Sequence, residues 1–269
     1  MCLDNGMRNL SKNKETLLFL ILSGIFITNA LMAEFIGVKI FSLERTLGMI
    51  PVDWHLLGQG NLSFNLTSGV LLWPVVFILT DIINEYYGPK GVRFLSYLTS
   101  GLIIYSFLVV SVAIRLVPAD FWPGSHLAKY PDSEVHNLNT AYQLIFGQGL
   151  WIIVGSICAF IIGQVLDVYV FHKIKERTGE SSIWLRSTGS TLISQLVDSY
   201  VVLLIAFYIG AGWPFKLVLA IGTINYIYKF VIALISTPVV YLVHHWIEQF
   251  LGEELASRMK RDASLKINE

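Results

Sequence analysis

Six long apolar stretches follow one another along the chain, separated by short polar segments. Their apolar residues do not alternate with a period of two, so they predict helices and not strands. Each stretch is long enough to cross a bilayer, which needs about 20 helical residues. The pattern therefore predicts an all-α polytopic membrane protein, a bundle of six transmembrane helices over residues 17–41, 66–87, 92–117, 142–171, 184–209 and 215–246.

The polar segments indicate the orientation. Thirteen Lys and Arg residues lie in or next to the segments on one side of the predicted bundle, against four on the other side. Short loops rich in Lys and Arg stay in the cytoplasm, so both termini are predicted to be cytoplasmic. We expect a cytoplasmic N-terminal arm over 1–16, a six-helix transmembrane domain over 17–246 and a cytoplasmic C-terminal tail over 247–269. Residues 118–139 contain three prolines and predict an irregular outer loop.

Composition narrows the class of protein. Residues of the apolar set make up 54% of the chain and charged residues 14%, against roughly a quarter in average soluble domains. Lys+Arg and Asp+Glu are both 19, so no basic excess predicts a nucleic-acid partner. The two cysteines, Cys2 and Cys158, are far apart, which predicts neither a disulfide framework nor a metal site. We expect the lipid bilayer as the surroundings and no cofactor.

Polar side chains inside the predicted helices are the candidates for function. A charged side chain at the centre of a membrane helix costs at least ~2.5–3.5 kcal/mol. Such side chains can simply hold helices together, and we favour that interpretation for the hydroxyl groups. For the Asp residues we favour a functional site. The polar residues expected inside the bundle are Asn29, Glu34, Asp81, Asn84, Glu85, Gln164, Asp167, Gln195, Asp198, Asn225 and Lys229.

The fourth and fifth predicted helices share a pattern. Gln164 and Asp167, like Gln195 and Asp198, are three residues apart and so lie on one helical face. The two helices are antiparallel, and counting from their loop places both Gln residues ~14 Å deep, at one level. A ridge of small residues on the fourth helix predicts close approach of a neighbouring backbone, at Gly155, Ala159 and Gly163.

Lys229 is a deep cation that needs a partner, because an unpaired buried charge is strongly destabilising. Its depth allows a pair with either Glu34 or Asp198.

The second predicted helix contains two acidic residues on one face. Glu85 lies near the basic residues of the following loop, so we interpret it as an interfacial residue, whereas Asp81 is one turn deeper and a better site candidate. Pro74 is expected to bend this helix around a cavity. Trp73 either supplies a stacking surface or only packs against its neighbours.

These side chains predict binding and passage of a solute rather than bond breaking. The chain has no His-Glu-x-x-His, Gly-x-Ser-x-Gly or Gly-Lys-Ser/Thr motif. We interpret nearly all of the six histidines as residues of loops and tails, and His244 and His245 as an interfacial feature, which makes an intramembrane hydrolase the weakest alternative. Carboxylates, amides and aromatic rings without a cationic surplus suit a neutral or cationic planar heterocycle such as a guanine-like base, and do not favour phosphate.

Four motifs occur in order along the chain: Thr-Asp-Ile-Ile-Asn-Glu-Tyr-Tyr-Gly at 80–88, Gly-Gln-Val-Leu-Asp at 163–167, Ser-Thr-Leu-Ile-Ser-Gln-Leu-Val-Asp-Ser at 190–199 and Asn-Tyr-Ile-Tyr-Lys at 225–229. Together they resemble the queuosine precursor transporter family, also named the vitamin uptake transporter family. The resemblance implies six helices and a likeness to the S components of energy-coupling-factor transporters. It also implies a non-enzymatic importer of the prokaryotic cell inner membrane, which takes up 7-deazaguanine bases such as 7-cyano- or 7-aminomethyl-7-deazaguanine for tRNA queuosine salvage.

The resemblance maps the polar positions of the family onto this chain. We expect Asp198, Gln195 and Gln164 to contact the base, with Asp81 and Asp167 assisting. The further candidates for the substrate site are Lys229, Asn225, Asn29 and Trp73.

Several alternatives stay open in the sequence. The chain can be an S-component-like binding subunit that needs an ATPase module, or a membrane scaffold whose polar groups only join helices. Protonation of Asp81 or Asp198 can couple import to protons, or later enzymes can trap the imported base. A homodimer is also compatible with the sequence.

Overall fold

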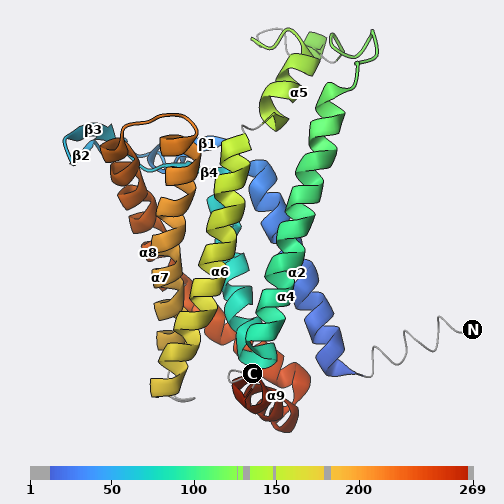
Figure 1. Cartoon of the computed structure of the whole chain (residues 1–269), viewed down its shortest axis with the longest axis vertical. Helices are drawn as coiled ribbons and strands as arrows, with labels where there is room; N and C mark the ends of the chain where they lie inside the picture. The colour runs from blue at the N-terminus through green and yellow to red at the C-terminus, as the bar shows by residue number, and fades with distance from the viewer. Residues whose placement is uncertain (1–12, 126, 130–133, 148–149, 179–182, 266–269) are drawn as a thin grey trace, which may run out of the picture.

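A computed structural model describes residues 13–125, 127–129, 134–147, 150–178 and 183–265. Within these residues, five helical segments are long and apolar enough to cross a membrane. They comprise α2 (Lys14–Ile36), α4 (Trp73–Arg115), α5 (Leu138–Phe146) with α6 (Leu150–Thr178), α7 (Ile183–Leu203) and α8 (Phe215–Leu251). Figure 1 shows these long helices side by side, as expected for a polytopic helical bundle.

Helix α4 consists of two arms that correspond to the second and third predicted stretches. Its backbone leaves the helical conformation at Gly88, with φ 75° and ψ −177°, and Pro89 follows. In Figure 1 both arms extend from this bend towards the other end of the bundle, so the chain reverses its direction at the bend. A Cβ atom at residue 88 would lie 3.1 Å from the backbone oxygen of Ala263, so both the positive φ and the close packing require glycine. The bend thus lies between the second and third predicted stretches, and the exact number of membrane spans stays a prediction.

The boundaries at the opposite end of the bundle differ from the prediction, because short strands replace helix there. The first helix stops at Ile36, since β1 (Ile40–Ser42) pairs with β4 (Asn65–Thr67) in an antiparallel sheet. The second begins only at Trp73, after the 3₁₀ turn η1 (Ser68–Leu71). Pro74 therefore lies in the first turn of α4, where it removes no helical hydrogen bond, and the predicted bend at Pro74 is wrong. The fourth predicted stretch, expected to begin at residue 142, is divided between α5 (Leu138–Phe146) and α6 (Leu150–Thr178).

A second small sheet covers the end of α8. Strands β2 (Trp54–Leu56) and β3 (Gln59–Leu62) form a hairpin, and Leu62 packs against Ala220 and Ile224. Nearby, α3 (Leu43–Thr46) carries the buried Glu44. Burial alone would raise the pKa of the Glu44 carboxyl. The backbone N–H of Phe64 and the Ser42 hydroxyl donate hydrogen bonds to this carboxyl, and the net result is a pKa below its usual value.

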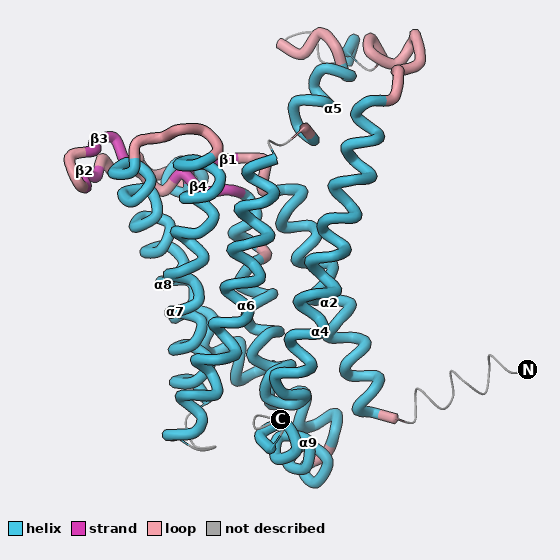
Figure 2. The backbone as a smooth tube through the Cα atoms, viewed as in Figure 1, coloured by secondary structure: helices cyan, strands magenta, loops and turns pink. Residues whose placement is uncertain are grey.

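The remaining elements complete the two ends of the molecule. The outer loop contains the 3₁₀ helix η2 (Leu127–Lys129), and α7 continues as a π-helix, η4 (Leu204–Ile209). Helix α9 (Glu253–Leu265) follows α8 and buries Ala256, Met259 and Ala263. Figures 1 and 2 place α9, the start of α2 and the α4 bend at one end, which we call the α9 end, and the strands at the other, the strand end. This arrangement is the one expected if the basic residues near both termini share one side of a membrane.

Small residues bring α6 and α7 together, as the sequence predicts. A Cβ atom at Gly155 would lie 3.1 Å from the backbone oxygen of Val202, and one at Gly163 would lie 3.8 Å from the Asp198 side chain. Only glycine allows the first of these approaches without a shift of the partner helix.

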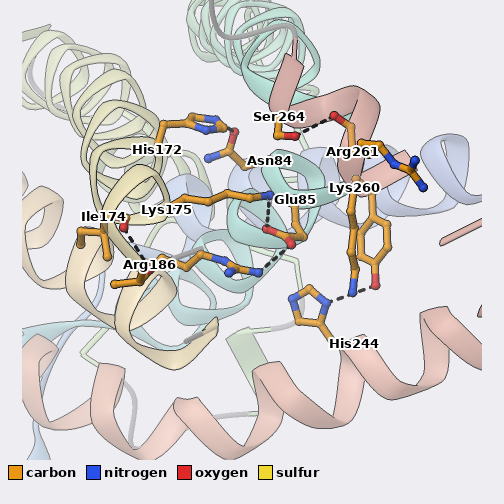
Figure 3. A network of polar contacts seen from close by, with 12 residues as sticks. Asn84, Glu85, His172, Ile174, Lys175, Arg186, His244, Lys260, Arg261 and Ser264 are labelled. Carbon is orange, nitrogen blue, oxygen red and sulfur yellow. Dashed lines mark hydrogen bonds and ion pairs between the residues drawn. The ribbon is translucent and has the colours of Figure 1, made fainter. Parts of the chain in front are cut away.

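A buried ion cluster joins α4, α6 and α7 near the α9 end (Figure 3). Glu85 is 1% exposed and accepts hydrogen bonds from Arg186 (0% exposed) at 2.7 Å and from Lys175 at 3.3 Å. The ion-pair role that we predict for Glu85 is confirmed, but the side chain is buried and its printed partners are Arg186 and Lys175 rather than basic residues of the following loop. The sequence did not predict this pairing, because the partners lie about 90 and 101 residues away.

Two histidines are also buried at this end, so the loop position predicted for His172 is wrong, and His244, which we interpret as interfacial, is buried as well. His172 of α6 lies 2.8 Å from the side-chain oxygen of Asn84, and His244 of α8 lies 3.2 Å from the Tyr86 hydroxyl (Figure 3). Both are 5% exposed. Each joins a different helix to the first arm of α4, so this arm contacts α6 and α8 through polar side chains.

We expect the Arg186→Gln variant to lose about 3–5 kcal/mol of stability, because it leaves a buried carboxylate with only part of its compensation. Thermal or denaturant unfolding of the protein in detergent measures the loss. The matched control is Arg93→Gln, an exposed basic residue near the α4 bend, which we expect to change stability by no more than about 0.5 kcal/mol. Equal losses in the two variants would contradict the assignment of Arg186 as the main partner of Glu85.

Candidate functional site

A cavity of about 520 Å³ lies between the first arm of α4, α7 and α8. Its wall is mainly apolar and aromatic, with polar side chains at a few positions. The lining residues are Val70, Trp73, Pro74, Phe77, Ile78, Asp81, Ser187, Thr188, Thr191, Gln195, Tyr228, Lys229, Ile232, Ala233, Ser236 and Val240. Cavities that combine apolar walls with a few polar groups are typical of small-molecule sites.

Asp81 is the acidic residue of this lining, at the end nearest the α4 bend. It is 3% exposed, and its Oδ2 accepts a hydrogen bond from Ser187 of α7. Within the described part of the chain, its Oδ1 has no hydrogen-bond partner. A buried acceptor without a donor costs about 1–3 kcal/mol, so this oxygen favours an incoming N–H group.

Gln195 lies on the α7 side of the same cavity. It is 3% exposed, and its Nε2 has no hydrogen-bond acceptor among the described residues. The cavity therefore offers an acceptor at Asp81 and a donor at Gln195.

Aromatic rings form the wall that faces these groups. Trp73 packs between Phe77 and Phe160, with ring centroids 6.1 Å and 5.6 Å away, and Tyr228 lines the cavity from α8. The packing interpretation of Trp73 is therefore confirmed, and its role as a stacking surface stays a prediction for a ring that also lines the cavity. Flat apolar surfaces of this kind suit a planar ligand.

Lys229 lines the cavity from α8 and pairs with Asp198 of α7. This is one of the two partners that the sequence allows, whereas Glu34 accepts a hydrogen bond from Ser156 of α6. Asp198 itself is not part of the cavity lining, although its side chain is 19% exposed. The ammonium group of Lys229 is thus already engaged, which disfavours phosphate as a ligand.

The other candidates lie behind the lining. Gln164 is 1% exposed and accepts hydrogen bonds from Thr80 at 3.0 Å and Ser96 at 3.4 Å. Asp167 is fully buried and accepts from Ser194 at 3.1 Å. Ser194 of α7 faces Asp167 of α6, which fixes the level of one helix against the other. Measured from this contact, Gln164 and Gln195 lie within about two residues, or ~3 Å, of one level along the bundle.

Two candidates lie outside the cavity. Asn29 donates to the backbone oxygen of Ile25 in its own helix, at 2.8 Å. Asn225 is half-buried on α8, one turn from Lys229, and is not a lining residue.

Sequence reasoning missed several lining residues. Thr188, Tyr228 and Ser236 contribute hydroxyl groups, and Phe77 contributes a ring. The spacing of four from Tyr228 through Ile232 to Ser236 is the signal that could have found this face of α8. The described residues contain no group of three His, Cys, Asp or Glu side chains that could hold a metal ion.

Comparison with known proteins agrees with this picture. A family model described as "Putative vitamin uptake transporter" matches residues 67–243. The chain is 35% identical over 177 residues to the "Probable queuosine precursor transporter" of Bacillus subtilis (strain 168), a match that covers 65% of this chain and 70% of the relative. It is 27% identical over 209 residues to the protein of the same name from Haemophilus influenzae (strain ATCC 51907 / DSM 11121 / KW20 / Rd), covering 75% and 80%.

A third relative is the "Queuosine precursor transporter" of Escherichia coli (strain K12), 24% identical over 180 residues, with 65% of this chain and 70% of the relative covered. No solved structure matches the chain. The family match covers well over half of the sequence, and its span includes every residue of the cavity lining. The chain is therefore a multi-pass membrane protein that belongs to the vitamin uptake transporter family, whose relatives named above are queuosine precursor transporters.

Proposed function

We propose that this protein imports queuosine precursors, 7-deazaguanine bases, across the inner membrane for tRNA queuosine salvage. The observation that carries the proposal is the buried Asp81 carboxylate, whose Oδ1 lacks a donor, at the end of an aromatic-walled cavity in a chain of this family. The base passes through unchanged, so the protein acts as a transporter and not as an enzyme.

The cavity supports a specific pose for such a base. The N–H and NH₂ groups on the guanine edge donate to Asp81, and Nε2 of Gln195 donates to the ring carbonyl. Trp73, Phe77 and Tyr228 cover the faces of the ring. This pose places Asp81 and Gln195 in direct contact with the base.

The remaining candidates support this site from behind in our proposal. The Asp198–Lys229 pair fixes α7 against α8 on either side of the cavity. Gln164 joins α6 to α4 through Thr80, and Asp167 joins α6 to α7 through Ser194. Asn29 and Asn225 lie farther from the proposed base.

We also propose that the strand end faces the outside and the α9 end faces the cytoplasm, as the Lys and Arg distribution predicts. In this orientation the Glu85 ion cluster lies on the cytoplasmic side of the cavity, one turn below Asp81. The cluster then closes the path to the cytoplasm in the described conformation.

We expect the purified protein to bind 7-cyano-7-deazaguanine, with a rise in unfolding temperature, and to bind adenine much more weakly. Asp81→Ala removes a charge-assisted hydrogen bond worth about 1.5–3 kcal/mol, so we expect a roughly 10–100-fold higher Kd. Titration calorimetry of both variants measures the change. The control is Asp120→Ala, an exposed loop residue outside the cavity. Wild-type protein that binds adenine as tightly as the deazaguanine would contradict the proposed pose.

We expect Asp198→Asn to abolish most uptake of the base in cells that lack any partner ATPase module, because Lys229 is left partly buried without its carboxylate. Replacing both residues, as Asp198→Asn with Lys229→Gln, should restore part of the uptake, since no unpaired charge remains. Radiolabelled uptake, normalised to the amount of protein in the membrane, tests this. Wild-type uptake that needs an added ATPase module would instead favour an S-component-like binding subunit.

A further inference from the structure

Two buried carboxyl groups from different helices meet beside the cavity. Asp81 of α4 is 3% exposed and Asp167 of α6 is 0% exposed. Thr80, next to Asp81, donates to Gln164, one turn from Asp167, and both carboxyl groups accept hydrogen bonds from α7, so the two side chains are neighbours. Two neighbouring carboxyl groups hydrogen bond with one another only if one of them carries a proton, because a carboxylate has no donor.

The surrounding hydroxyl groups leave exactly one oxygen of each carboxyl group without a partner. Ser187 donates to Oδ2 of Asp81, and Ser194 donates to Oδ1 of Asp167 at 3.1 Å. Within the described residues, Oδ1 of Asp81 and Oδ2 of Asp167 have no hydrogen-bond partner. A single proton on Oδ2 of Asp167 can be donated to Oδ1 of Asp81, and the second lone pair of this oxygen still accepts an N–H group of the base.

The charged groups on the neighbouring helices are engaged with other partners. Glu85 of α4 is one turn from Asp81, and its charge is compensated by Arg186 of α7 and Lys175 of α6. Lys229 of α8 shares the cavity with Asp81 but pairs with Asp198. The other titratable groups of the packed helices have the following contacts: Glu34 of α2 with Ser156, His172 of α6 with Asn84, His244 of α8 with Tyr86, and Lys260 of α9 with Glu248 at 2.5 Å.

We propose that Asp81 and Asp167 form a proton-binding site at the edge of the cavity, and that one proton enters the cell with each imported base. The proposal rests on the proposed function. The proton comes from the outer solution through the cavity, is held between the two carboxyl groups, and leaves to the cytoplasm after the base. No bond within the base forms or breaks.

Binding of the proton strengthens binding of the base at this site, and binding of the base strengthens binding of the proton. With the proton on Asp167, Asp81 keeps one negative charge that accepts the N–H groups of the base. Without it, two neighbouring carboxylates repel one another and keep water in the cavity, which the base must displace. The Asp198 carboxyl instead forms an ion pair with Lys229.

Proteoliposomes containing the protein test this coupling, with 7-cyano-7-deazaguanine as the probe and the membrane potential clamped. We expect wild-type protein to accumulate the base about tenfold for each unit by which the outside is more acidic than the inside, since one pH unit is worth about 1.4 kcal/mol per proton. Asp167→Asn keeps a permanent donor next to Asp81. We expect it to bind and equilibrate the base while its accumulation changes less than about twofold per pH unit.

The control is Asp120→Asn, the same substitution at an exposed loop residue, which should keep the wild-type response. If Asp167→Asn fails to fold, calorimetry of the wild-type protein in buffers of different ionisation enthalpy and rising pH decides: once the pH is high enough to remove the shared proton from the free protein, we expect uptake of about one proton per base bound. Wild-type protein that binds and equilibrates the base without proton uptake or gradient-driven accumulation would overturn the coupling and leave the proposed function intact. Absence of binding to wild-type protein would overturn the proposed function itself.

Discussion

A buried charge must find an opposite charge, a hydrogen-bond donor or a proton, and this requirement determines how the helices of this bundle meet. The cluster of Glu85, Arg186 and Lys175 is the strongest case, because three charged side chains are held at 8% exposure or less. Its members come from α4, α6 and α7, so each helix has only one register in which the cluster forms. The cluster therefore fixes the axial position of these helices relative to one another.

The position of the cavity follows from this register. Asp81 lies one turn from Glu85, and Ser187 lies one residue from Arg186, so the cluster also places the Ser187 hydroxyl on the Asp81 carboxylate. The Asp198–Lys229 pair joins α7 to α8 in the same way. Between these two sets of ionic contacts, Asp81 and Gln195 keep polar atoms without partners, and these atoms are the ones available to a ligand.

The two ends of the bundle are closed by different means. At the α9 end, the sharp bend at Gly88 reverses the chain, and α9 packs so closely on it that no side chain fits at residue 88. At the strand end, the β1–β4 sheet follows the end of α2, and the β2–β3 hairpin packs against the start of α8. The extra polar backbone at this end pairs within the small sheets, which agrees with a location at the membrane surface. The cavity thus lies in a bundle whose helices are anchored at both ends.

Only the tertiary structure decided the contacts of several sequence-predicted residues. Glu85 looked interfacial because basic residues follow it in sequence, yet its partners come from two other helices. The sequence places His172 just after the fourth predicted stretch and His244 at the end of the sixth, and neither position indicates a buried partner. The short strands have no clear alternating pattern in the sequence. Asp81 and Gln195 became lining residues, whereas Gln164 and Asp167 became supports, through helix rotation that depends on neighbours far away in the chain.

The sequence by itself determined the all-α membrane class, the succession of helical segments, the small residues between α6 and α7, and the set of polar residues inside the bundle. These properties are local, because hydropathy over about 20 residues decides whether a segment favours a membrane helix. The tertiary structure decided which of these polar residues face the cavity and which face one another. The physical reason is that the energy of a buried polar atom depends on the one group that it touches, and that group lies on a different helix.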